Sequence, residues 1–172
     1  MPHRRTLLVV PALLALPLAA PAAAQPPGLI PTVSKIRPDG IGAFKVGMTP
    51  RQARKAAGTV YYVKQKVGAC TYWDFGPPNT GQGPYLRFQK GRIRYVDVGR
   101  RQFKTKRGVE VGNSVRKVRR NYNHLHRHSD LGGGYRLAVR FGKYRLVFTI
   151  AGRKVSRIAG GRGQYALQQE CV

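Results

Sequence analysis

Arginine side chains alternate with apolar ones in several stretches of the chain. Arg92 and Arg94 alternate with Ile93 and Tyr95. Residues two apart in a β-strand project to the same face, so apolar sides would cover a core and arginines would point outward. A guanidinium pairs bidentately with carboxylates or phosphates. The pattern favours an anion-binding sheet face, or a solvated face that discourages edge-to-edge aggregation. The candidate binding residues are Arg92, Arg94, Arg136, Arg140 and Arg145, with Trp73, Pro77 and Asn79.

Three histidines lie close together before residue 130. In an extended strand, His124, His126 and His128 would share one side with the carboxylate of Asp130. Such a set could bind zinc or copper. Neighbouring arginines would repel a cation, which favours solvated edge-strand histidines instead. We therefore predict no metal and no other cofactor.

No constellation typical of an enzyme is visible. The chain has no suggestive carboxylate pair, Gly-rich phosphate loop or nucleophile elbow. Tyrosines amid the basic residues could stack on nucleobases, but aromatics at strand spacing more often belong to a core, and no nucleic-acid-binding motif occurs. We predict a non-catalytic protein that does not bind nucleic acid.

The chain is strongly basic, with 32 Lys and Arg against 6 Asp and Glu and a formal net charge of +26. Such an imbalance causes self-repulsion and attracts polyanions. In an extracellular salt solution, much of that surface charge would be screened. The charge alone leaves open an acidic protein, an envelope polymer, a membrane surface or a nucleic acid.

The N-terminus has the pattern of a secretory signal peptide over residues 1–24. Arg4 and Arg5 precede an apolar stretch from Leu7 to Leu18, and small residues end at Ala24. An uncleaved anchor is the alternative, but prolines interrupt the apolar run, so we expect no membrane span in the mature chain. Residues 25–38 are proline-rich and predict an extended leader. The expected location is the exterior or the extracytoplasmic envelope.

The two cysteines, Cys70 and Cys171, would form a disulfide in an exported protein. The bridge would tie the C-terminal tail, residues 163–172, back to the middle of the chain. For so long a loop, the chain-entropy model gives a stabilisation of about 4–5 kcal/mol. Free or intermolecular thiols are the alternative.

A short motif occurs twice, 65 residues apart. Val46–Arg54 is echoed by Val111–Arg119, with Thr49 and Ser114 as matching N-caps of short helices. Gln52 completes a capping box with Thr49, whereas Lys117 leaves the second box incomplete. After each helix the pattern alternates as in strands. Strands are predicted at Val60–Val67, Cys70–Phe75, Tyr85–Gln89 and Arg92–Val98, then at His124–His128, Tyr135–Phe141, Tyr144–Ile150 and Arg153–Ile158.

These elements predict an α+β protein of two tandem modules, residues 39–103 and 104–162. Each module would be a short helix packed on its own four-stranded antiparallel meander sheet. The modules differ at one hairpin, where Gly76–Pro84 stands in place of the two-residue turn Gly142-Lys143. This longer loop is either a functional loop or a neutral insertion.

The motif Gly42–Thr49, the helix end at Gly58 and the turn Lys90–Ile93, followed by a second copy, resemble the tandem repeats of secreted β-lactamase inhibitory proteins. They are also similar to the small lipoprotein subunit of the bacterial outer-membrane assembly machinery. The resemblance implies two sheets that form a concave binding surface, without naming a target.

Together these observations predict a secreted, monomeric binding protein whose basic sheet face engages an acidic protein. An inhibitor-like protein is one form of this prediction. The alternative is an envelope-associated protein held electrostatically to an anionic polymer or lipid, with binding that weakens steeply as salt rises.

Overall fold

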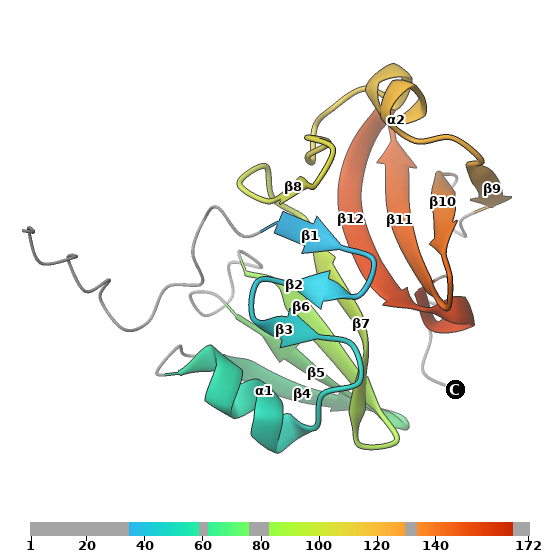
Figure 1. Cartoon of the computed structure of the whole chain (residues 1–172). Helices are drawn as coiled ribbons and strands as arrows, with labels where there is room; N and C mark the ends of the chain where they lie inside the picture. Colours follow the sequence, from blue (N-terminus) through green and yellow to red (C-terminus); the bar gives the residue numbers. More distant parts are fainter. Residues whose placement is uncertain (1–34, 59–61, 76–82, 130–133, 167–172) are drawn as a thin grey trace, which may run out of the picture.

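The chain folds around one large antiparallel sheet (Figure 1). The structure is a computed structural model that describes residues 35–58, 62–75, 83–129 and 134–166. The sheet has eight strands in the order β4-β5-β6-β7-β12-β11-β10-β9. The strands span Val63–Val67 (β4), Cys70–Asp74 (β5), Tyr85–Gln89 (β6), Arg92–Val98 (β7), Lys154–Arg162 (β12), Tyr144–Ala151 (β11), Tyr135–Phe141 (β10) and His126–Ser129 (β9).

The prediction of an α+β fold with two tandem modules is wrong. Most of the described residues form strands, and α1 and α2 are the two α-helices among them. The two meanders are not separate sheets, because β7 of the first half pairs with β12 of the second. That pairing runs antiparallel from Ile158↔Val98 to Gly161↔Tyr95. The edge strand of one meander forms its backbone hydrogen bonds with the edge strand of the other, so a single sheet forms instead of two.

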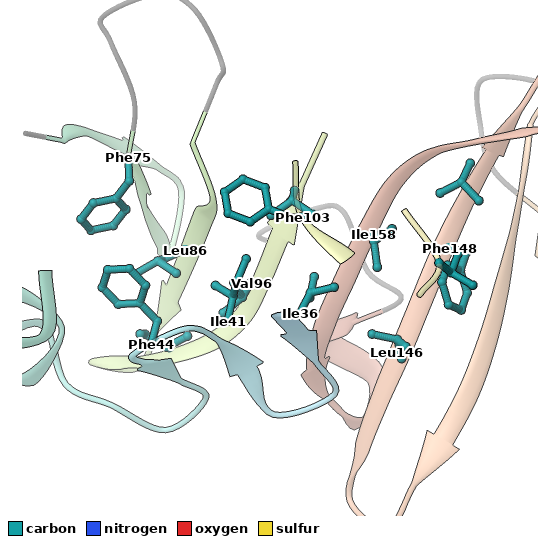
Figure 2. Packing of buried hydrophobic residues seen from close by; sticks show 14 of the residues in the cluster. Ile36, Ile41, Phe44, Phe75, Leu86, Val96, Phe103, Leu146, Phe148 and Ile158 are labelled. Atoms are coloured by element: carbon teal, nitrogen blue, oxygen red, sulfur yellow. The ribbon is translucent and has the colours of Figure 1, made fainter. Parts of the chain in front are cut away.

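A second, smaller sheet lies across the seam where β7 meets β12. It has the order β3-β2-β1-β8, with bounds Phe44–Lys45, Gly40–Ile41, Lys35–Arg37 and Lys104–Thr105. Figure 2 shows Ile36, Ile41 and Phe44 beside Val96 and Ile158 of the large sheet, and all five side chains are buried. Three residues of the predicted extended leader thus form β1, and one of them, Ile36, joins the core.

The two copies of the motif make equivalent backbone hydrogen bonds. The Gly47 N–H donates to the Ile93 carbonyl (2.7 Å), and the Gly112 N–H donates to the Val155 carbonyl (2.7 Å). Each motif therefore joins the start of its helix to the last strand of its own meander. Both glycines have positive φ, 101° and 89°, which an L-residue rarely adopts.

The helices begin where the cap residues predict. α1 spans Pro50–Ala57, with Thr49 and Gln52 forming the complete capping box. α2 spans Val115–Asn121, and the Ser114 hydroxyl accepts a hydrogen bond from the Lys117 N–H (3.3 Å). Both helices are short, so packing stabilises them more than intrinsic propensity does. Ala53 and Ala57 of α1 and Val118 of α2 are buried in the core.

A β-bulge in β7 changes which side chains face the core. Arg87 pairs with Tyr95, but Phe88 pairs with Ile93, so Arg94 is the additional residue. The alternation predicted from sequence placed Ile93 and Tyr95 on one face. Instead, Ile93 joins the main core, whereas Tyr95 packs on the opposite face against a second cluster. That cluster comprises Ala138, Val147, Ala159 and Ala166, the last from the 3-10 helix Gly163–Ala166.

Candidate functional site

A basic cleft lies at one end of the seam between the two halves. It has a volume of about 270 Å³ and is lined by Val46, Gly47, Arg92, Arg94, Lys143, Tyr144 and Arg162. Arg92 and Arg94 come from the start of β7, Lys143 from the β10–β11 turn, and Arg162 from the end of β12. Four cationic side chains therefore surround one hollow, and no Asp or Glu is among the lining residues.

Local contacts position three of these four cations. Arg92 Nη1 donates to the Gly47 carbonyl (3.0 Å), and Arg94 Nε donates to the Gln89 carbonyl (3.3 Å). The Lys143 ammonium lies 5.5 Å from the centre of the Tyr144 ring. The three partners named here are uncharged groups. An anion in the cleft would interact favourably with all four groups at once.

The other predicted arginines do not join the cleft. In the large sheet, Arg136 pairs with His128 and Arg140 pairs with Arg145 across neighbouring strands, on the face opposite the main core. Arg136 is only 8% exposed, so the expectation that it points into solvent is wrong. Arg140 is exposed, and its Nε donates to the Gly142 carbonyl (2.9 Å). The predicted row of arginines is thus divided between two regions of the molecule.

The histidines do not form the predicted line. His124 lies before β9 with φ 54°, outside the strand alternation, whereas His126 and His128 belong to β9. Burial lowers the pKa of His128, and the nearby charges of Arg145, His126 and Arg136 lower it further. Within the described ranges, no group of three or more His, Cys, Asp or Glu side chains gathers as a metal site would require. Asp130 is outside those ranges.

Trp73 is almost fully buried, at 3% exposed, and belongs to an aromatic cluster. Its ring stacks on Tyr62 with centroids 4.4 Å apart and lies 4.5 Å from Phe88. Pro77, Asn79 and Cys171 lie outside the described residues. The predicted disulfide therefore stays a prediction, and Cys70 is buried at 1% exposed.

A polar network crosses the seam on the face opposite the main core. Asp97 of β7 accepts two hydrogen bonds from Arg157 of β12, at 2.7 and 3.2 Å, and a third from the Tyr95 hydroxyl at 3.1 Å. Burial, and then the charge of Asp97, raise the pKa of Tyr95 well above its usual value. Burial alone would lower the pKa of Arg157, but the charge and hydrogen bonds of Asp97 outweigh it and raise that pKa.

The same network extends to Asp74 and Tyr85. Burial raises the pKa of Asp74, against the opposing effect of its hydrogen bond from Tyr85. Burial and that hydrogen bond raise the pKa of Tyr85. The guanidinium of Arg157 lies over the Tyr85 ring, 5.3 Å from its centre. Because the network links strands of both halves and the charges of Asp97 and Arg157 are paired, we interpret it as a structural feature of the seam.

Sequence reasoning missed two of the four cations in the cleft. Lys143 occupies a hairpin turn and Arg162 ends a strand, so neither position belongs to the central alternating runs that drew attention to arginine. The sequence did contain one signal for these cations, the positions of the hairpin turns. Lys143 lies at the tip of one hairpin, and Arg92 lies beside the tip of another. Only the β7–β12 pairing brings those two tips to the same cleft.

Two solved structures are similar to this chain in fold. One is the uncharacterised protein YfeY from Escherichia coli, with 12% identity, a TM-score of 0.55, and coverage of 74% of this chain and 99% of that one. The other is an extracellular protein containing an SCP domain from Bacillus anthracis, with 9% identity, a TM-score of 0.52, and coverage of 72% of this chain and 46% of that one. At such identities the likeness concerns the fold alone.

No protein-family model matches the chain, and no curated protein matches it in sequence. The resemblance to β-lactamase inhibitory proteins stays a prediction. Among the described residues, no helix has the length and apolar character needed to cross a membrane.

Proposed function

We propose that this protein is an exported, non-catalytic binding protein that engages an acidic protein partner through the basic cleft. The observation that carries the proposal is the convergence of Arg92, Arg94, Lys143 and Arg162 on one hollow whose lining contains no carboxylate. Four like charges repel one another, and a cluster of partner carboxylates would relieve that repulsion.

Two features support an extracytoplasmic location. The N-terminal 24 residues have the pattern of a signal peptide, and one of the two proteins of similar fold is described as extracellular. In such a setting the strong positive charge of the chain would speed the encounter with an acidic surface, while contacts inside the cleft would select the partner.

The alternative is retention on an anionic envelope polymer or lipid by charge alone. The overall charge favours it, since an imbalance of this size attracts any polyanion. The two functions differ in shape dependence. A partner held in the cleft depends on four particular side chains, whereas diffuse retention depends on the total charge.

The deciding experiment reverses two charges inside the cleft and compares the same change outside it. Lys143→Glu/Arg162→Glu changes two exposed cleft residues, and Arg116→Glu/Arg119→Glu changes two exposed residues of α2 by the same total charge. Tagged proteins would be used to capture partners from culture fluid and from envelope fractions at low and high salt. The affinity of each captured protein would then be measured by calorimetry.

A salt-resistant partner that is lost with the cleft variant and retained with the α2 variant supports the proposal. Equal loss with both variants, together with release at high salt, would show retention by total charge and would refute a role for the cleft. No capture of any acidic protein at either salt concentration would also refute it.

A further inference from the structure

The strand β4 forms an open border of the large sheet (Figure 1). It pairs with β5 in an unbroken register from Val63↔Asp74 to Val67↔Cys70, and no other described strand pairs with it. In an edge strand, every second residue directs its N–H and C=O groups away from the sheet, where another chain can pair with them. β4 therefore offers a regular row of backbone donors and acceptors.

The other sheet borders in the described part of the chain are less suited to such pairing. β3 and β8, the borders of the small sheet, have two residues each. β9, the opposite border of the large sheet, has the four residues His126–Ser129, none of which is apolar. β4 has five residues, and all of them are exposed. It is the longest sheet border that the structure describes.

Two valines give one face of β4 an apolar character. Val63 and Val67 are 39% and 47% exposed, and they are two of the three large apolar side chains that the described residues expose. They share a face with Asp74 and Cys70, their partners across the β4–β5 pairing. An added strand could cover both valines with apolar side chains of its own.

Two lysines give the other face of β4 a positive charge. Lys64 and Lys66 project to the face that carries Trp73, and neither makes an ion pair within the described residues. Lysines on a sheet border discourage pairing with a second copy. Two antiparallel β4 strands centred on Gln65 would set Lys64 of each copy against Lys66 of the other, and like charges directly opposite are destabilising. The same charges would attract a strand with Asp or Glu at those places.

We propose that an acidic, extended segment of a partner protein adds to the eight-stranded sheet by pairing with β4. Backbone hydrogen bonds would supply affinity, and alternating side chains would supply specificity. Acidic side chains would lie beside the two lysines, and apolar side chains beside the two valines. Asp74 would repel an acid on the valine face, which reinforces this order. The proposal does not depend on the basic cleft, since no residue of β4 lines it.

The probe is the peptide acetyl-Val-Glu-Thr-Glu-Val-amide, which has the same sequence in both directions and so suits a parallel or an antiparallel pairing. Its affinity for the mature protein would be measured by calorimetry at constant ionic strength. Two control peptides keep its charge. The peptide acetyl-Val-Val-Thr-Glu-Glu-amide lacks the alternation, and a version methylated at every backbone nitrogen lacks the donors. Amide hydrogen exchange, followed by NMR, would locate the contact on the protein.

We expect saturable binding of the alternating peptide and at least tenfold weaker binding of both control peptides. Backbone N–H groups of β4 should exchange at least tenfold more slowly at saturating peptide. Lys64→Glu/Lys66→Glu should weaken binding about thirtyfold, because it replaces two attractions by two repulsions. Arg116→Glu/Arg119→Glu makes the same change of charge on α2 and should stay within about twofold of the parent. Thermal melting would verify that both variants are folded.

Equal affinities of the alternating peptide and its rearranged control would show attraction by charge alone and would overturn the proposal. No saturable binding of the alternating peptide, or slower exchange in another strand and not in β4, would do the same. Self-association of the parent protein that slows exchange in β4 would identify a second copy as the occupant and would refute an acidic partner. The control peptides need no protein variant, so these outcomes are decisive even if Lys64→Glu/Lys66→Glu does not fold.

Discussion

The two halves of the molecule share a backbone plan and differ in what their side chains do. In each half, a motif glycine donates to the last strand, and that strand donates back: the Ile93 N–H to the Met48 carbonyl (2.8 Å), the Val155 N–H to the Asn113 carbonyl (2.9 Å). Each half then places a short helix beside a four-stranded meander (Figure 1). The equivalent bonds use backbone groups, so they constrain few side chains.

The side chains that pack around this shared backbone plan differ between the two halves. The first half packs an aromatic cluster, with Phe75, Trp73 and Phe88 in contact. The second half packs mainly aliphatic residues around Phe148 and places arginines on the opposite face. The comparison teaches that candidate binding features lie where the halves differ or where they meet, and that the shared motif is scaffold.

The seam can be broken from the side of the small sheet. Gly160 of β12 lies beneath β1, and a Cβ atom there would stand 2.2 Å from the Arg37 carbonyl oxygen and 3.1 Å from that of Pro38. Because those neighbours are backbone, Gly160→Val should force β1 away from the seam. We expect a loss of about 3 kcal/mol in the free energy of unfolding, measured by urea denaturation.

Gly99→Ala is the control for this prediction, since nothing lies within 4 Å of a Cβ atom at that position. Its effect should stay within about 0.5 kcal/mol. If Gly160→Val is as stable as the parent, then the small sheet does not hold the two halves together.

The seam can also be weakened from the opposite face. Asp97→Asn removes the charge that Arg157 binds through two hydrogen bonds, and the Asp97 side chain is only 8% exposed. Breaking a fully buried pair costs several kcal/mol, but Arg157 is 41% exposed and water can solvate it in the variant. We therefore expect a loss of about 2 kcal/mol in the free energy of unfolding, measured by urea denaturation.

The matched control is Asp39→Asn. Asp39 pairs with Arg37 at 3.2 Å, and both side chains are 41% exposed, so the loss should be below about 0.5 kcal/mol. Equal effects of the two substitutions would contradict the view that the Asp97–Arg157 pair stabilises the seam.

Local features of the fold could be predicted from the sequence, whereas the global arrangement could not. β6, β7 and β10 span the residues that alternation indicates, and α1 starts at the predicted cap. The single large sheet was missed because the β7–β12 pairing depends on which edges remain open, and nothing in either strand alone encodes it. The small sheet was missed because strands of two or three residues are too short to show alternation.

The candidate site was predictable only in part. Arg92 and Arg94 were identified from alternation, although the bulge at Arg94 could not be anticipated from spacing. The prediction that Arg136 points into solvent was wrong. Alternation along a strand shows which residues share a face, but it does not show that the second face also carries a packed cluster.

The smallest expected change in the free energy of unfolding comes from giving the two helices the same capping box. In α1, the Thr49 N–H donates to Gln52 Oε1 (2.8 Å), and α2 has Lys117 at the equivalent position. Lys117→Gln would complete the second capping box and remove a positive charge from the positive end of the helix. We expect a gain of about 0.5 kcal/mol in the free energy of unfolding, and Gln52→Lys should cause a loss of similar size. If neither substitution changes the urea midpoint, the difference between the two caps has no energetic consequence, and the halves are equivalent at their helices despite their sequences.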